Sequence, residues 1–244
     1  MKTEFIVRVF LTVDRGFDPG EQWVFDRIKQ FRKTTLVSLL NQVSAPPFKI
    51  WLICGEKYRY ITEDVEFNDC IKVYDHGKDQ LAATQAEAIS ITRIDSDDLM
   101  HKDAMAEVFE YAKRANDFKT FIWKTCYRWY QEENAIVSWR TFSPPYFTHV
   151  FQKTFYKNFP FFKRTHFQQH GRVGKMPGVT EMSEHKICTV RNEMNASVMQ
   201  GFRNNNVEEM LKSPNNVLVS EDAGEIASIL SDFGISEGVS PIEN

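Results

Sequence analysis

The order of apolar patterns in the first half of the chain constrains the fold most. Runs rich in β-branched and aromatic residues, typical of buried strands, alternate with stretches whose apolar residues recur at helical spacing. The predicted strands are 5–13, 48–54, 71–74, 89–94 and 118–123, and the predicted helices are 23–42, 79–88 and 103–116. This alternation predicts an α/β fold with a mostly parallel sheet and helices on both of its faces.

Length and composition fit one ordinary domain with a small appendage. The chain has 244 residues, and its hydrophobic fraction of 42% is enough for a substantial core. The net charge of −3 argues against a dedicated nucleic-acid-binding protein, which is usually clearly basic. From Gly201 onward the composition becomes more polar, so we expect a domain over 1–200 and a polar tail over 201–244. The tail is predicted to hold short helices at about 206–212 and 222–233.

Cysteine spacing and apolar run length indicate the compartment. The four cysteines form no CxxC pair, which favours free thiols in a reducing environment. The first residues lead directly into a predicted strand, without the apolar core of a signal peptide. No apolar run is long enough for a transmembrane segment. We therefore expect a cytoplasmic protein.

An acidic cluster, Asp95-Ser96-Asp97-Asp98, directly follows the predicted strand 89–94. Ligands of open α/β sheets bind beyond the carboxyl ends of the strands. If the backbone is still extended here, the Asp95 and Asp97 carboxylates point to the same side and form a pair of hard oxygen ligands for Mg²⁺ or Mn²⁺. A helix cap is an alternative, but a cap needs one Asp rather than three. A solvated acidic turn is a second alternative.

Two further features belong to the same edge of the predicted sheet. The loop 12–16 follows the first strand, and Arg93 precedes Asp95 by two residues within the fourth. A buried arginine needs a partner. Arg93 can either clamp a diphosphate or pair with one of the neighbouring carboxylates.

The segment Thr92-Arg93-Ile94-Asp95-Ser96-Asp97-Asp98 resembles the DxD segment of GT-A glycosyltransferases. The likeness is closest to the bacterial putative rhamnosyltransferase family, which has further motifs in the same order. They are an Arg in the first strand, a Trp-led helix with an Arg and a Phe, a Ser-Leu-x-x-Gln helix end and a Phe-x-x-Trp strand, here at Arg8, Trp23, Arg27, Phe31, 38–42 and 48–51. The resemblance covers about residues 5 to 150, with a weaker likeness to about 200.

The resemblance implies a GT-A (Rossmann-like) αβα sandwich with a mostly parallel mixed sheet, a nucleotide-binding half and an acceptor-binding half. Asp95 and Asp97 would hold the metal, a Lewis acid that neutralises charge on the departing nucleoside diphosphate. Asp98 would contact the ribose or anchor the loop. The residues that the resemblance assigns to donor binding are Arg8, Thr12, Asp14, Arg93, Asp95 and Asp98.

The chain departs from the family pattern late in the domain. Many GT-A enzymes complete the metal shell with a late His, but this chain reads Val-Arg-Asn-Glu-Met-Asn over 190–195. His185 is the substitute candidate for a third metal ligand. Glu181 and Glu184 are candidates for the general base that an inverting transferase needs. A retaining mechanism would not need that base, and the sequence leaves both mechanisms open.

Two other patterns have competing interpretations. His166 and His170 have the spacing of a helical zinc pair, but no Glu follows the first His, so exposed or acceptor-cleft histidines are favoured. The aromatic residues within 123–139 suit an acceptor platform, although core packing is the commoner use of such residues. Residues 143–146, Ser-Pro-Pro-Tyr, are typical of a rigid turn.

These features together predict a metal-dependent glycosyltransferase that moves a sugar from a nucleotide-diphosphate donor to a hydroxyl of a saccharide or another acceptor. One alternative is a nucleotidyl- or phosphotransferase using the same carboxylates. A second is a non-catalytic protein of glycosyltransferase fold that binds nucleotide-sugars. The sequence leaves the donor sugar, the nucleobase and the acceptor open.

Overall fold

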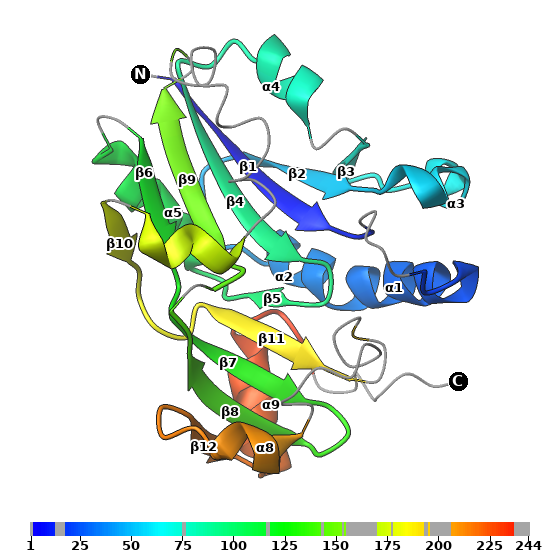
Figure 1. Ribbon diagram of the computed structural model, residues 1–244, viewed down its shortest axis with the longest axis vertical. Helices are drawn as coiled ribbons and strands as arrows, with labels where there is room; N and C mark the ends of the chain where they lie inside the picture. The colour runs from blue at the N-terminus through cyan, green and yellow to red at the C-terminus, as the bar shows by residue number, and fades with distance from the viewer. Residues whose placement is uncertain are drawn as a thin grey trace.

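The computed structural model describes residues 2–12, 18–74, 77–115, 118–142, 144–152, 154, 170–176, 178–192, 195 and 206–236. Two β-sheets organise these residues (Figure 1). The first has seven strands in the order β10-β6-β9-β4-β1-β2-β3. Their bounds are β1 (Thr3–Phe10), β2 (Phe48–Ile53), β3 (Cys70–Val73), β4 (Ala88–Asp95), β6 (Lys119–Ile122), β9 (Phe147–Gln152) and β10 (Val179–Glu181).

Strand direction in the first sheet agrees with the prediction of a mostly parallel sheet. Strand β1 lies between β2 and β4 and is parallel to both, and β2 is parallel to β3. Strand β9 runs antiparallel to both of its neighbours, while β10 is parallel to β6. The carboxyl ends of β1 to β4 therefore meet at one edge.

Alternating residues of β1 face two different layers. Phe5, Val7 and Val9 pack in one core with α1 (Glu21–Lys33), α3 (Arg59–Asp64) and α5 (Ala104–Lys113). Ile6 and Phe10 pack in a second core with α4 (Lys78–Ala83). Because side chains alternate across a strand, these two cores lie on opposite faces of the sheet. The predicted αβα sandwich is confirmed.

The single helix expected over 23–42 is two helices, α1 and α2 (Thr35–Leu40). Thr34 breaks the run, with φ −121° and ψ −84°. Its hydroxyl donates a hydrogen bond of 2.7 Å to the carbonyl of Gln30, a local bond that competes with regular helix geometry. Apolar spacing alone did not reveal this break. A short 3-10 turn, η1 (Glu56–Tyr58), leads into α3.

The second sheet has five strands in the order β12-β8-β7-β11-β5 and lies beyond the carboxyl end of β4 (Figure 1). Its pairings are antiparallel except for the parallel pair β7 and β11. The bounds are β5 (Leu99–Met100), β7 (Thr125–Tyr130), β8 (Ala135–Arg140), β11 (Ile187–Arg191) and β12 (Val217–Ser220). None of the predicted strands lies in the aromatic region that forms β7, β8 and β9.

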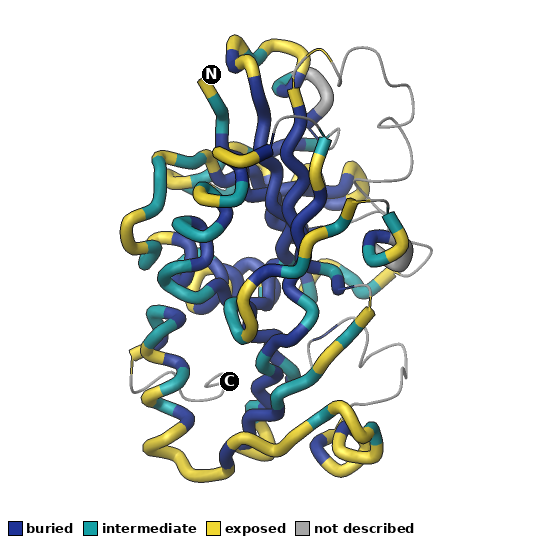
Figure 2. The backbone as a smooth tube through the Cα atoms, turned by 90° about the vertical axis from the view of Figure 1, so that its left-hand side faces the viewer, coloured by how far each residue is buried: buried dark blue, intermediate teal, exposed yellow. Residues whose placement is uncertain are grey.

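Residues 206–236, expected as a tail outside the domain, instead complete the second sheet. The expected helices are present as α8 (Val207–Leu211) and α9 (Ala223–Ser231), with strand β12 between them. Ile226, Leu230 and Phe233 pack against Leu99 and Trp129 in a shared core. Figure 2 shows buried residues running along the first sheet and on into the second. This packing was not predicted, because the sequence from Gly201 onward is mostly polar and has few apolar residues.

No helix in the described ranges is long and apolar enough to cross a membrane.

Phe233 tests whether the C-terminal segment is an integral layer. Its side chain is fully buried, so Phe233→Ala is expected to destabilise the protein by about 3–5 kcal/mol through lost burial and the cavity left behind. Urea unfolding measures this change. The matched control is Phe142→Ala, because Phe142 is 59% exposed and its truncation should have little effect. Equal effects of the two substitutions would show that the segment does not support the core.

Candidate functional site

The acidic cluster lies at a turn rather than along an extended strand. Strand β4 ends at Asp95, and the amide of Asp98 donates a hydrogen bond of 3.2 Å to the Asp95 carbonyl. The chain then enters β5 of the second sheet. The expectation that strand alternation places the Asp95 and Asp97 carboxylates on one side is therefore wrong, because the backbone turns at 96–97. Their positions depend instead on the partners of each carboxylate.

Arg93 pairs with Asp95. Its Nη2 lies 2.9 Å from Asp95 Oδ1, and its Nη1 donates to the Pro145 carbonyl at 2.5 Å. The guanidinium carbon lies 4.7 Å from the centre of the Phe10 ring. The Arg93 side chain is 3% exposed, whereas that of Asp95 is 30% exposed. Of the two expected roles for Arg93, the structure contains the ion pair with a neighbouring carboxylate.

Arg27 pairs with Asp97 from helix α1. Its Nη1 lies 2.6 Å from Asp97 Oδ2, and its Nε donates to Ser96 Oγ at 2.9 Å. The side-chain amide of Asn195 donates to the same Asp97 oxygen. Both members of the ion pair have side chains only 8% exposed. Arg27 reaches the turn from the face covered by α1, so arginines from two separate elements hold the two carboxylates.

Asp98 anchors the turn to the second sheet. Its Oδ1 accepts a hydrogen bond of 3.3 Å from the Val190 amide of β11, and the residue is buried. Burial raises the pKa of Asp98 well above its usual range, and the neighbouring Asp97 and Asp95 carboxylates add to the shift. The resemblance left ribose contact or loop anchoring open for Asp98. Because Asp98 is buried and bonded to β11, the structure favours a role in anchoring the loop over the predicted role in donor binding.

Two of the remaining donor-binding candidates, Arg8 and Thr12, lie in or directly after β1. Arg8 is buried, stands beside Arg93 in the register of the sheet, and has its guanidinium carbon 5.3 Å from the Phe10 ring centre. Thr12 Oγ1 accepts a hydrogen bond of 2.9 Å from the Gly55 amide. Asp14 lies outside the described residues. Arg8 is thus buried within β1, two residues before the strand ends, while Thr12 has a structural bond between two loops, and the donor-binding role of both stays a prediction.

His185 does not join the acidic cluster. Its ring stacks on Tyr127 with centres 4.2 Å apart, and its Nε2 lies 2.7 Å from Ser138 Oγ. It precedes β11, whereas Asp98 contacts the far end of that strand at Val190, roughly 16 Å away at 3.3 Å per residue. The described residues hold no group of three His, Cys, Asp or Glu side chains that could bind a metal ion. The prediction that His185 joins Asp95 and Asp97 as a third metal ligand is therefore wrong.

Glu181 and Glu184 belong to an ion-pair network. Glu181 lies 2.8 Å from Arg140 and 3.3 Å from Lys124, and Glu184 lies 3.8 Å from Arg140. Glu181 also shares a register row with Arg93 but is three strands away, roughly 14 Å at normal strand spacing. A structural role accounts for both carboxylates, and a general-base role stays a prediction.

Three residues that contact the acidic turn, Arg27, Asn195 and Tyr146, were not predicted to do so from the sequence. Arg27 was noted only as part of a Trp-led helix, with no role attached. Asn195 stands in the stretch where relatives of the resembled family carry a late His, and its Oδ1 accepts a bond of 2.6 Å from the Asn192 amide. Tyr146, expected only as part of a rigid turn, shares a hydrogen bond with the Asp98 side chain. His166 lies outside the described residues, as does the side chain of His170.

The oxygens not used by the arginines decide whether the turn can accept a cation. Asp95 Oδ2 and Asp97 Oδ1 have no hydrogen bond to any described residue. Two carboxylate oxygens fit a Mg²⁺ or Mn²⁺ site in which water and substrate phosphate supply the other ligands, the usual arrangement for these ions. By the chemistry of their donor atoms, Asp95 and Asp97 therefore fit a two-ligand metal site, and the described residues do not supply the three-ligand site that was expected.

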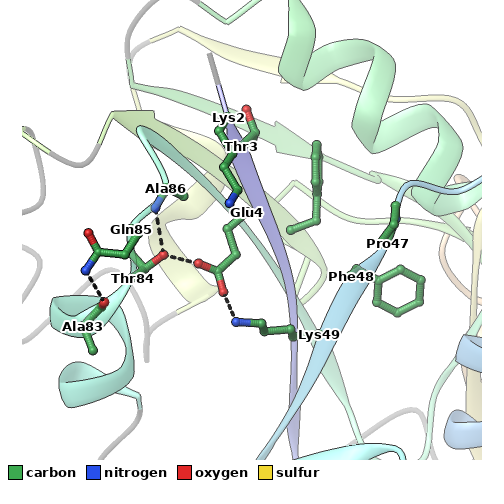
Figure 3. A pocket seen from close by; sticks show the side chains of 11 residues that line it. Lys2, Thr3, Glu4, Pro47, Phe48, Lys49, Ala83, Thr84, Gln85 and Ala86 are labelled. Carbon is green, nitrogen blue, oxygen red and sulfur yellow. Dashed lines mark hydrogen bonds and ion pairs between the residues drawn. The ribbon is translucent and has the colours of Figure 1, made fainter.

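A hollow of about 540 Å³ lies at the opposite end of the first sheet. It is lined by residues at the starts of β1 and β2 and by the segment after α4. Its carboxylate, Glu4, pairs with Lys49 at 2.5 Å and accepts a hydrogen bond from Thr84 (Figure 3). Ligands of such sheets bind at carboxyl ends, so this hollow is not the candidate site.

No family model matches the chain, and no curated protein matches it. Among solved structures, it is similar to a homolog of Mycobacterium tuberculosis rv0371c from Mycobacterium sp. strain JC1, at 13% identity and a TM-score of 0.37 over 75% of this chain and 87% of that one. It is also similar to Rv0371c of M. tuberculosis H37Rv in complex with manganese, at 13% identity and a TM-score of 0.36. That match covers 79% of this chain and 91% of the other.

A third similar structure is 4-diphosphocytidyl-2C-methyl-D-erythritol synthase from Anaerococcus prevotii DSM 20548. Its identity is 13% and its TM-score 0.29, over 86% of this chain and 96% of that one. Likenesses with TM-scores below 0.5 carry no argument about function.

Whether a cation at Asp97 can compensate for the loss of Arg27 can be measured. Arg27→Met leaves a buried carboxylate without its ion pair and should cost about 3–5 kcal/mol. Because a bound cation can replace the lost charge, Mn²⁺ should raise the melting temperature of Arg27→Met more than that of the wild type. Arg59→Met, which removes an exposed ion pair, is the control. An equal Mn²⁺ response in all three proteins would contradict a cation site at Asp97.

The structural position of His185 predicts a pH dependence of stability. Burial lowers the pKa of His185, partly offset by Glu184, so the unfolded chain binds more protons just below pH 6.5. Its contribution to stability is therefore lost as pH falls from 6.5 toward the lowered pKa. His185→Asn, which tolerates the φ of 59° at this position, should show a smaller loss of stability between pH 7.5 and 5.5 in urea unfolding. Identical losses in the two proteins would contradict this effect.

Proposed function

We propose that the protein is a metal-dependent glycosyltransferase that moves a sugar from a nucleotide-diphosphate donor to an acceptor hydroxyl. One observation carries the proposal. At the carboxyl end of a central parallel strand, two carboxylates are fixed by arginines, while each keeps an oxygen to which no described residue is bonded. Such an edge is where open α/β sheets bind nucleotides. The resemblance of 92–98 to the DxD segment of GT-A enzymes supports the same assignment.

The residues of the turn have separate tasks in this proposal. Arg93 and Arg27 orient Asp95 and Asp97, so that the oxygens available for a cation do not depend on exposed, freely rotating side chains. Asp98 fixes the turn to β11 of the second sheet, which holds the turn against movement when substrate binds. A preorganised site of this kind needs little rearrangement during the reaction.

Mg²⁺ or Mn²⁺ held by Asp95 and Asp97 would supply Lewis-acid neutralisation of the charge that develops on the leaving nucleoside diphosphate. Arg8, buried beside Arg93 at the same edge, adds positive charge on the donor side. The acceptor would bind over the second sheet, whose strands follow the acidic turn in the chain.

A non-catalytic nucleotide-sugar-binding protein is the second candidate, and one observation favours it. Asp97 Oδ2 is already held by both Arg27 and Asn195, and the described residues supply no third acidic or histidine ligand. Such a protein would bind nucleotide-sugars without turning them over. A nucleotidyltransferase using the same carboxylates would instead consume nucleoside triphosphates and release pyrophosphate.

Hydrolysis of the donor in the absence of an acceptor tests the proposal. UDP-, GDP-, dTDP- and CMP-sugars are first screened by thermal shift with and without Mn²⁺, because a ligand of the native state raises its melting temperature. Asp95→Asn and Asp97→Asn should each lower the metal-dependent release of nucleotide by about a hundredfold, since a bound cation contributes several kcal/mol to charge stabilisation.

Asp26→Asn is the matched control and should keep the wild-type rate, because Asp26 is a half-buried aspartate of α1 that contacts Gln22 and Lys29 and not the acidic turn. Binding of a nucleotide-sugar with no release of nucleotide in the wild type would favour the non-catalytic candidate. Release that is unaffected by both Asp95→Asn and Asp97→Asn would refute the assignment of the acidic turn.

A further inference from the structure

Arg128 is a buried cation that has no role in the proposed reaction. It lies on β7 of the second sheet and is 7% exposed. Its Nε donates to Thr189 Oγ1 at 3.1 Å, and its Nη1 donates to the Met210 sulfur at 3.4 Å. The guanidinium carbon stands 4.2 Å from the Trp139 ring centre. A hydroxyl, a thioether and an aromatic ring all lack a negative charge.

The lack of a carboxylate partner distinguishes Arg128 from the arginines of the acidic turn. Arg27 and Arg93 each form an ion pair with an aspartate, whereas none of the described carboxylates lies within ion-pair distance of Arg128. Taking a charge out of water is costly unless an opposite charge accompanies it. The structure therefore holds a desolvated positive charge whose counter-charge is not supplied by the described chain.

A second arginine lies beside it. In the parallel pair of β7 and β11, Arg128 is opposite Thr189 and Tyr130 is opposite Arg191, so these four side chains share one face of the sheet. Burial and the nearby Arg128 charge lower the pKa of Arg191, while Tyr146, Tyr130 and Asp98 act in the opposite direction. Arg191 keeps part of its surface exposed, so an anion can approach from its side. Two arginines that share one face of a sheet, one of them buried, are typical of a site that binds an oxyanion.

We propose that Arg128 and Arg191 form a binding site for a phosphoryl oxyanion on the second-sheet side of the acidic turn. Asp98, which bonds to β11 at Val190, lies next to Arg191 in this arrangement. Planar guanidinium groups match the oxygens of a phosphoryl group through paired N–H donors. The Tyr130 hydroxyl, which hydrogen-bonds to Arg128, lies on the same face and fixes the orientation of its guanidinium.

The phosphoryl group could come from either of two substrates. It is the diphosphate of the donor, or it is a phosphate carried by the acceptor. Only this assignment to a substrate depends on the proposed transferase function. Anion binding by the two arginines does not depend on it.

The test uses calorimetric titration of the full chain with inorganic pyrophosphate and, separately, with glycerol phosphate, in the presence of EDTA. Chelation removes any contribution from divalent cations at the acidic turn. Arg128→Met should weaken pyrophosphate binding by about tenfold to a hundredfold, the usual effect of losing charge-assisted hydrogen bonds. Arg128→Lys should retain part of the affinity, since it keeps the charge but not the paired donors. Arg114→Met, at an exposed arginine, should bind as the wild type does.

Thermal unfolding without any anion separates binding from a structural role. If Arg128 awaits an oxyanion, Arg128→Met removes an uncompensated buried charge and leaves the melting temperature equal or higher. A lower melting temperature together with unchanged pyrophosphate affinity would overturn the proposal and give Arg128 a purely structural role. Unchanged affinity for both anions in Arg128→Met would also overturn it.

The two anions identify the source of the phosphoryl group. Tighter Arg128-dependent binding of pyrophosphate supports the donor diphosphate, and tighter Arg128-dependent binding of glycerol phosphate supports a phosphorylated acceptor. The same titrations with Asp97→Asn distinguish this proposal from the transferase proposal. Anion binding in EDTA should survive Asp97→Asn even if donor hydrolysis proves to be absent in the wild type.

Discussion

The ion pair between Arg27 and Asp97 determines the geometry of the candidate site. Arg27 belongs to α1, which covers one face of the first sheet, and Asp97 belongs to the turn through which the chain passes into the second sheet. The next residue, Asp98, bonds to β11 of that second sheet. A single turn thus connects helix, first sheet and second sheet, and the positions of its carboxylates follow from these two bonds.

Burial makes the members of the turn depend on one another. Three aspartates within four residues repel one another unless their charges are offset. Arg93 and Arg27 offset the charges of Asp95 and Asp97. Burial raises the pKa of Asp98, and the Asp97 and Asp95 carboxylates raise it further. Loss of either arginine would therefore disturb all three carboxylates, and not only its own partner.

The first sheet could be predicted because both of its faces are buried, so its strands appear as unbroken apolar runs between helical patterns. The second sheet could not, because aromatic residues such as Trp129 and Tyr130 occupy both of its faces and obscure a period of two. Arg93 lies two residues from Asp95, so their pairing could be anticipated. Arg27 and Asn195 are 70 and 98 residues from Asp97, and contacts across such separations leave no local pattern. His185 was wrongly predicted as a metal ligand, because the sequence does not show that the residues before β11 lie far from the acidic turn.

The arginines also decide the charge that the acidic turn would have with a metal bound. Without them, a divalent cation would be neutralised by the Asp95 and Asp97 carboxylates, and the turn would have little attraction for a diphosphate. With Arg93 and Arg27 in place, the two carboxylates are already neutralised. A divalent cation would then leave the turn positive, and Arg128 on the second sheet would add to the same field. An anionic leaving group would therefore be stabilised from both sheets, which is the electrostatic arrangement that transfer from a diphosphate donor requires.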